Sequence, residues 1–144
     1  MRCAVCAADL TGPVTPHRFA LRVYYEDTDL AGIVYYANYL KFIERARSEW
    51  VRALGINQTR MHAEQGLIFA VRRVEADYLR PAKFDDNLVV QTTEHRHTGA
   101  RMVLDQTVLR SVEVLFTARV TLVCLTATGQ PGRLPAALIA ALSA

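Results

Sequence analysis

Hydrophobic and polar residues alternate along residues 17–26. This pattern predicts a half-buried β-strand, because successive side chains of a strand point to opposite faces. The apolar face of this strand would hold Phe19, Leu21, Val23 and Tyr25. An acidic segment closed by Gly32 follows and predicts a polar turn.

The hydrophobic repeat changes to three and four residues between about residues 36 and 54, which predicts an amphipathic helix. Gly55 stands where such a helix would end, and Asn38 is an alternative capping residue at its start. The apolar stripe of the helix would consist of Tyr39, Phe42, Ile43, Ala46, Trp50 and Leu54.

The alternating pattern returns after a loop through Gly66 and predicts four further strands, at residues 68–79, 87–94, 101–111 and 114–126. The turns between them are short, so neighbouring strands should be antiparallel. Residues 1–16 predict an N-terminal tail, and residues 135–142 a short terminal helix. We therefore expect an α+β fold in residues 17–144, a single domain in which an antiparallel sheet of about five strands wraps around one long central helix.

Composition agrees with one folded domain, since 51% of the 144 residues are hydrophobic and 22% are charged. Such a chain is too apolar for intrinsic disorder. The formal net charge is +3, and the densest basic cluster is the pair Arg72 and Arg73. Nucleic-acid binders usually carry a basic run or stripe, so we expect no nucleic-acid partner.

Three cysteines are present, at positions 3, 6 and 124. An odd number without a disulfide framework favours a reducing compartment, and we expect a cytoplasmic protein. Cys3 and Cys6 form a C-x-x-C pair, but no second pair or closely spaced histidines complete a zinc site, so no metal is expected. No apolar stretch reaches the roughly 18–20 residues that a membrane span requires.

Residues 24–39, YYEDTDLAGIVYYANY, combine acidic side chains, a glycine turn and the start of the predicted helix. The first amides of a helix lack an intrahelical partner and carry positive partial charge, so they can polarise a carbonyl group. A nearby carboxylate can act as a base or a nucleophile. The acidic residues also fit a purely structural role, since aspartates before a glycine commonly bond the backbone of their own turn.

This segment, together with FIERAR at residues 42–47, resembles the signature of the 4-hydroxybenzoyl-CoA thioesterase family of hot-dog-fold proteins. It is particularly similar to the bacterial acyl-CoA thioesterases encoded beside the Tol–Pal system. The likeness continues through FAVRR (69–73), YLRPA (78–82) and VTLVC (120–124), and it spans roughly residues 17–135. The resemblance implies a hot-dog fold and an acyl-CoA thioester hydrolase that needs no cofactor.

The resemblance also implies three catalytic positions. Asp29 matches the family's catalytic aspartate, which either attacks the thioester carbonyl to give a mixed anhydride or activates a water that does. Tyr36 matches the position whose backbone N–H, at the helix start, polarises that carbonyl, and Tyr25 matches a tyrosine that lines the site. The Tol–Pal-associated members typically carry a histidine in place of Tyr36, but any residue except proline supplies the N–H. We expect the Asp29 carboxylate to face the amides at the helix start.

For binding and assembly the resemblance implies a basic patch for the CoA phosphates and a homodimer at minimum, with sites at the shared interface. Such dimers commonly pair into homotetramers. Exposed arginines on a strand are often only edge protection, so some candidates for the patch would have no ligand. The candidates are Arg72, Arg73, Arg96, His97 and Arg101, and the resemblance favours Arg96.

Two other classes of function stay open. One is a non-catalytic module that binds acyl-CoA or an acyl carrier protein, and the other is a dehydratase, which the lack of a histidine on the predicted helix disfavours. On that helix, Glu44 and Arg47 stand at the spacing of an ion pair. The tyrosines near the helix start fit an acyl pocket or the core equally well; they are Tyr24, Tyr35, Tyr36 and Tyr39.

Overall fold

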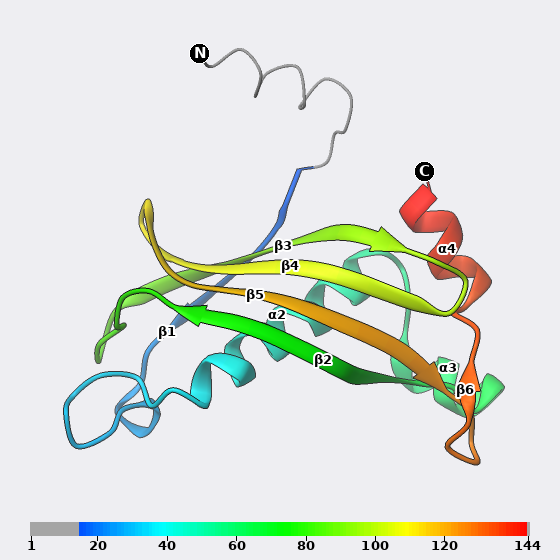
Figure 1. Cartoon of the computed structure of the whole chain (residues 1–144), viewed down its shortest axis with the longest axis horizontal. Helices are drawn as coiled ribbons and strands as arrows, with labels where there is room; N and C mark the ends of the chain where they lie inside the picture. Colours follow the sequence, from blue (N-terminus) through cyan, green and yellow to red (C-terminus); the bar gives the residue numbers. More distant parts are fainter. Residues whose placement is uncertain (1–14, 144) are drawn as a thin grey trace, which may run out of the picture.

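The computed structural model describes residues 15–143, so the predicted N-terminal tail and its C-x-x-C pair lie almost wholly outside the described residues. Figure 1 shows one curved sheet with helices at one face and at one end. The elements follow one another as β1 (His17–Arg22), the 3₁₀ turn η1 (Tyr25–Asp27), α2 (Asn38–Ala53), α3 (Gln58–Gln65), β2 (Ile68–Tyr78), β3 (Asn87–His97), β4 (Arg101–Arg110), β5 (Glu113–Leu125), β6 (Pro131–Gly132) and α4 (Ala136–Ser143).

Five long strands form one antiparallel sheet in the order β1-β3-β4-β5-β2, and the two-residue β6 adds to the end of β5. The strands β1 and β2 are therefore the two edges of the sheet. Register is set by the inward apolar rows, so that Val90 opposes Phe19 and Leu122 opposes Val71. The predicted α+β fold, a sheet of about five strands around one long helix, is confirmed.

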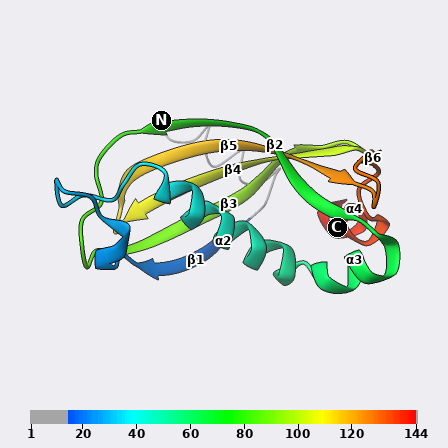
Figure 2. The same ribbon diagram turned by 90° about the horizontal axis from the view of Figure 1, so that it is seen from below.

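The helix α2 lies along the inner face of the sheet and packs chiefly beneath β1 and β3 (Figure 2). The stripe predicted from the sequence is its buried face: Tyr39, Phe42, Ile43, Ala46 and Trp50 are all buried. The residue after the helix, Gly55, has φ = 90°, a left-handed conformation that ends the helix at little steric cost.

Several boundaries and elements differ from the sequence-based expectation. The first strand ends at Arg22, four residues early, and Tyr25 is exposed rather than on the buried face. The reason is local, since the Asp27 Oδ2 atom accepts a hydrogen bond from the Tyr24 N–H at 2.8 Å and closes a 3₁₀ turn. The expected loop before Gly66 contains the helix α3, which the Asn57 side chain caps by accepting from the Arg60 N–H at 3.0 Å.

One half of the sheet's inner face is left uncovered. The inward residues of β5 are buried, and their partners on the edge strand β2 point to the same side. Yet Val71, Val74 and Tyr78 of β2 are 46%, 39% and 47% exposed. An apolar row that faces inward but remains in contact with solvent is a surface that another element or molecule would cover. Among residues 15–143, no helix is both long and apolar enough to span a lipid bilayer.

The buried face of α2 yields a stability prediction. Replacing Phe42, which is 1% exposed, by alanine should lower the free energy of unfolding by about 3–5 kcal/mol, because the removed ring leaves a cavity in the core. Urea unfolding followed by circular dichroism measures the change. The matched control is Leu40→Ala on the same helix, where the side chain is 41% exposed and the loss should be much smaller. Equal losses in the two variants would contradict this assignment of the buried face.

Candidate functional site

The loop between η1 and α2 is held by the backbone of Asp27. Its carbonyl oxygen accepts hydrogen bonds from the Tyr35 N–H and from the Asn38 side chain, both at 2.9 Å. A bridge between Thr28 and Val34 closes the loop, and the Val34 N–H donates to the Ala82 carbonyl. Asp27 therefore anchors the loop to the first residue of the helix, Asn38.

Asp29 lies at the exposed tip of this loop, where its backbone forms a tight turn. Its carbonyl accepts from the Gly32 N–H at 2.9 Å, and Gly32 has φ = 81°, which favours glycine. The Asp29 Oδ1 atom accepts from the Ala31 N–H at 2.9 Å. Among the described residues, Oδ2 has no hydrogen-bond partner, and no bond joins the carboxylate to an amide at the start of α2. One carboxylate oxygen is thus held by its own turn and the other is unbonded, so the expected contact between the Asp29 carboxylate and the amides at the helix start is not formed within residues 15–143 of the single chain.

Tyr36 lies two residues before the helix, which begins at Asn38. The residue is fixed on both sides: the Tyr35 N–H is bonded to Asp27, and the Tyr36 carbonyl accepts from the Tyr78 hydroxyl at 3.0 Å. No carbonyl in the described part of the chain accepts the Tyr36 N–H. A donor that is held in place and left unbonded can polarise a carbonyl without reorganisation.

An apolar hollow of about 330 Å³ opens beside Tyr36. Its volume is at the lower end of the roughly 300–1,000 Å³ typical of small-molecule sites. The rings of Tyr36 and Tyr78 meet edge-on with centroids 6.2 Å apart, and those of Tyr39 and Tyr78 at 5.5 Å. The lining residues are Ile33, Val34, Tyr36, Tyr39, Tyr78, Leu79, Arg80 and Pro81.

The hydroxyl groups around this hollow are tied to its walls. Tyr39 is buried, and its hydroxyl accepts from the Ala82 N–H at 3.0 Å. Burial raises the pKa of Tyr39, and burial together with the neighbouring Tyr36 raises the pKa of Tyr78. Both hydroxyls therefore stay protonated at neutral pH, and the hollow presents ring faces rather than charge. Its one cation, Arg80, forms an ion pair with Glu113 at 3.5 Å.

Of the tyrosines considered from the sequence, Tyr36 and Tyr39 line the hollow, whereas Tyr24, Tyr25 and Tyr35 do not. The Tyr25 ring packs edge-on against Phe84, with centroids 6.4 Å apart. Sequence reasoning missed Tyr78, which occupies the inward face at the end of β2. The alternation of β2 was the available signal, since it places Tyr78 on the same side as Val74.

The candidate phosphate-binding cations do not gather around Asp29 within one chain. The loop contacts residues 82–86, just before β3 begins at Asn87, and Arg96 stands near the far end of that strand. At about 3.3 Å per residue, Arg96 and His97 lie roughly 30 Å from the loop. His97 is also engaged, with its Nδ1 atom 3.2 Å from Glu94.

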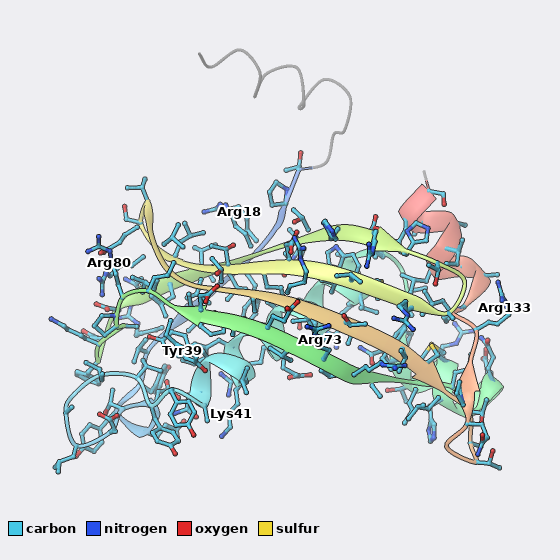
Figure 3. The ribbon with its side chains drawn as sticks, viewed as in Figure 1. Arg18, Tyr39, Lys41, Arg73, Arg80 and Arg133 are labelled. Carbon is cyan, nitrogen blue, oxygen red and sulfur yellow. The ribbon has the colours of Figure 1, made fainter. Side chains whose placement is uncertain are left out.

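Arg72 and Arg73 are nearer to the loop, about midway along β2. Figure 3 shows Arg73 in the middle of the sheet, well separated from Tyr39 and Arg80 at the loop end. Arg73 contacts Glu75 at 3.0 Å, and Arg72 is the extra residue where the register with β5 shifts.

Two other kinds of chemistry find no support in the described residues. No group of three or more metal-ligating side chains occurs within residues 15–143. Cys124 is free and buried, and burial raises the pKa of its thiol to about 11. The thiol stays protonated at neutral pH and is not an activated nucleophile.

Comparison with known proteins identifies the family to which the chain belongs. A model of the thioesterase-like superfamily matches residues 23–142. The acyl-CoA thioesterase YbgC of Haemophilus influenzae is 43% identical over 106 residues, covering 74% of this chain and 78% of that protein. The acyl-CoA thioester hydrolase YbgC of Escherichia coli O6:H1 is 38% identical over 128 residues, covering 88% and 95%.

Solved structures agree. A probable thioesterase from Bartonella henselae superposes with a TM-score of 0.81 at 40% identity, covering 84% of this chain and all of that one. A 1,4-dihydroxy-2-naphthoyl-CoA thioesterase from Synechocystis reaches 0.82 at 22% identity over 90% and 96% of the two chains, which shows a shared fold alone. The resemblance read from residues 24–39 is confirmed: the chain belongs to the thioesterase-like superfamily and has its hot-dog fold.

Proposed function

We propose that the chain hydrolyses the thioester of an acyl-CoA to the free acid and CoA, with Asp29 as the reactive carboxylate. One observation carries the proposal: a single short loop joins a carboxylate with a free oxygen to an unbonded amide, Tyr36 N–H, beside an apolar hollow. The similar proteins named as acyl-CoA thioesterases support the same reaction.

The reaction has two versions that share these groups. In the first, an Asp29 oxygen attacks the carbonyl carbon, the C–S bond breaks, and the CoA thiolate leaves and takes up a proton; water then cleaves the mixed anhydride and restores Asp29. In the second, Asp29 removes a proton from a water whose oxygen attacks the carbonyl, and that proton passes to the departing sulfur. In both, the Tyr36 N–H donates to the carbonyl oxygen as negative charge develops there.

The acyl group would occupy the hollow formed by Tyr36, Tyr39 and Tyr78, since its lining is apolar and it adjoins the amide that would polarise the carbonyl. For Tyr25, an exposed ring in η1 that packs against Phe84, we propose a contact with substrate bound at Asp29. Because the Cys124 thiol is free, we propose that the protein works in a reducing compartment, the cytoplasm.

Asp29→Asn tests the chemical step. The amide cannot act as nucleophile or base, so kcat should fall at least about 100-fold while the variant still folds and binds substrate. Thiol release from a panel of short, medium, long and aromatic acyl-CoAs measures turnover, and calorimetry measures binding. The control is Glu26→Gln, which removes an exposed negative charge just before the loop and should leave kcat near wild type.

Two results would contradict the proposal. Wild-type turnover by Asp29→Asn would show that residue 29 serves only its own turn, the structural role that its bond to Ala31 allows. A wild-type protein that binds acyl-CoAs but hydrolyses none would instead be a binding module for acyl-CoA or an acyl carrier protein.

A second test concerns the phosphates of CoA. We propose that Arg72 and Arg73 contact them within the same chain, and that Arg96 and His97 do so only from a partner subunit. Arg73→Ala should lower kcat/KM about tenfold for an acyl-CoA but not for the matching N-acetylcysteamine thioester, which has no phosphate. Equal losses on both substrates would show that Arg73 has no role in phosphate binding. Arg18→Ala, on the opposite edge strand, is the control.

We also propose a homodimer that forms through the β2 edges. The outer edge of β2 has no partner strand in the described chain, and the inward row with Val71 and Val74 is uncovered. Antiparallel pairing of two β2 strands would satisfy the edge and join the two sheets into one. Pairs of such dimers would give the tetramer that the family resemblance implies.

Val74→Lys tests the proposed interface. A charge in the centre of the apolar row should raise the dimer dissociation constant at least about 100-fold, as measured by light scattering across a dilution series. Val112→Lys makes the same change in the β4–β5 turn, where the side chain is 91% exposed, and should leave the dimer intact. An unchanged dimer in Val74→Lys would place the contact elsewhere.

A further inference from the structure

The guanidinium of Arg47 on α2 is buried, and Glu44 on the same helix is close enough to act on its charge without forming an ion pair. Arg47 is 9% exposed, and Nη1 donates to the Gln106 Oε1 atom at 3.0 Å. No carboxylate among residues 15–143 forms an ion pair with it, so the pair with Glu44 that the helix spacing suggested is not formed. Burial lowers the pKa of Arg47. A buried charge without a partner is costly, and proteins rarely keep one.

The partner of Arg47 inside the chain is itself fully engaged. Gln106 is 1% exposed, and its Nε2 atom donates to the Ile43 carbonyl at 2.9 Å and to the Thr92 hydroxyl at 3.0 Å. The amide oxygen of Gln106 is therefore fixed toward Arg47. A guanidinium carries five N–H donors, and the bond to Gln106 uses one of them.

The remaining donors of Arg47 meet a hollow of about 180 Å³ between α2 and the uncovered half of the sheet. Phe69 and Val71 of the edge strand β2 form one wall, and Glu44 and Ser48 of α2 form part of the other. This hollow is distinct from the one beside Tyr36, because the two share no lining residue.

Glu44 is a carboxylate on the same helix that also forms no ion pair within residues 15–143. It is exposed, and its Oε2 atom accepts a hydrogen bond from the Ser48 hydroxyl at 2.9 Å. That bond holds the carboxylate on its own helix, where Glu44 partly offsets the effect of burial on the pKa of Arg47 but forms no ion pair with it. A carboxylate and a guanidinium thus lie one helical turn apart at the same hollow, and neither has an ionic partner within residues 15–143.

The two-fold symmetry of the proposed dimer would bring Glu44 of one subunit toward Arg47 of the other. Two antiparallel β2 strands in one continuous sheet are related by a two-fold axis perpendicular to it, so both α2 helices lie on the same face and run antiparallel. Val71 is near the middle of β2, so the hollow that it lines lies close to this axis. In a two-fold interface every contact occurs twice, so a helix face with one negative and one positive group is self-complementary.

We infer that in the dimer Arg47 of each subunit binds the Glu44 carboxylate of a second copy of this chain. The inference rests on the dimer proposed above and goes beyond it, because it assigns the charge pair that fixes the helix register across the axis. The Arg47 site is incomplete in one chain, and the second copy contributes the missing ligand. Charge-assisted pairs of this kind are stronger than neutral hydrogen bonds.

Charge reversal with mixing tests the pair. E44K should place an ammonium group against the partner's guanidinium, and R47E should place two carboxylates together, so each homodimer should dissociate at least about tenfold more readily than wild type. An equimolar mixture of the two variants has attractive pairs at both positions and should form a heterodimer with a dissociation constant within about threefold of wild type. Sedimentation velocity with one tagged partner measures both values. E49K is the control, since Glu49 is already paired with Arg52 on the helix surface.

The outcomes separate this inference from the proposals on which it rests. An E44K homodimer with the dissociation constant of the wild type would overturn the proposed Glu44–Arg47 pair. A mixture of E44K and R47E that dimerises no more tightly than either variant alone would also overturn it. In either case, loss of the dimer in Val74→Lys would still support the β2 interface. A monomeric wild type would overturn both. If R47E fails to fold, E44K against E49K decides alone, because Glu44 is exposed in the single chain and its reversal leaves the core untouched. Thioester hydrolysis by the wild type is measured separately, so a failure of the proposed function is distinguishable from a failure of the pair.

Discussion

The structure depends on a mismatch of width between one helix and the sheet it covers. A helix with its side chains is about 10–12 Å across, whereas five strands at about 4.8 Å spacing are about 20 Å wide. The helix α2 therefore covers the β1 and β3 side and leaves the inward row of β2 in solvent. Both the hollow beside Tyr36 and the hollow beside Arg47 border this uncovered half. The candidate site and the proposed interface therefore both border the part of the sheet that the helix is too narrow to cover.

The candidate site uses backbone rather than side chains for most of its geometry. Asp27 fixes the loop through its carbonyl, Gly32 closes the turn that holds Asp29, and Tyr78 fixes Tyr36 through the Tyr36 carbonyl oxygen. In the proposed mechanism the donor at residue 36 is the backbone amide, so a tyrosine can stand where the family resemblance implies a histidine. Preorganised amides of this type can contribute about 3–4 kcal/mol to transition-state stabilisation.

How much the sequence predicts depends on the range of the contacts involved. Periodicity identified α2 and the sheet, because Phe42 and its neighbours report burial at fixed local spacing. The motif at residues 24–39 identified the loop with Asp29 and Tyr36. The contacts of Tyr78 and Arg47 were not predicted. Tyr78 bonds Tyr36 across 42 residues of the chain, and Arg47 bonds Gln106 across 59, so both contacts form only when the sheet has formed. The helix α3 was missed because its eight residues bury little more than Met61.

The distance between Asp29 and the basic end of the sheet would give the second copy of the proposed dimer a further role. Arg96 and His97, the candidates for phosphate binding, lie about a strand length away from the loop within one chain. In the proposed dimer a two-fold axis near the middle of β2 would reverse the direction of the partner, so the far end of its sheet would come to the same side of the assembly as the Asp29 loop. The charge pair between Glu44 and Arg47 would fix the relative position of the two subunits near the axis. A small shift of the helices there would become a larger displacement at the ends of the two sheets. Binding of the nucleotide end of a substrate would then depend on a contact in the middle of the helix.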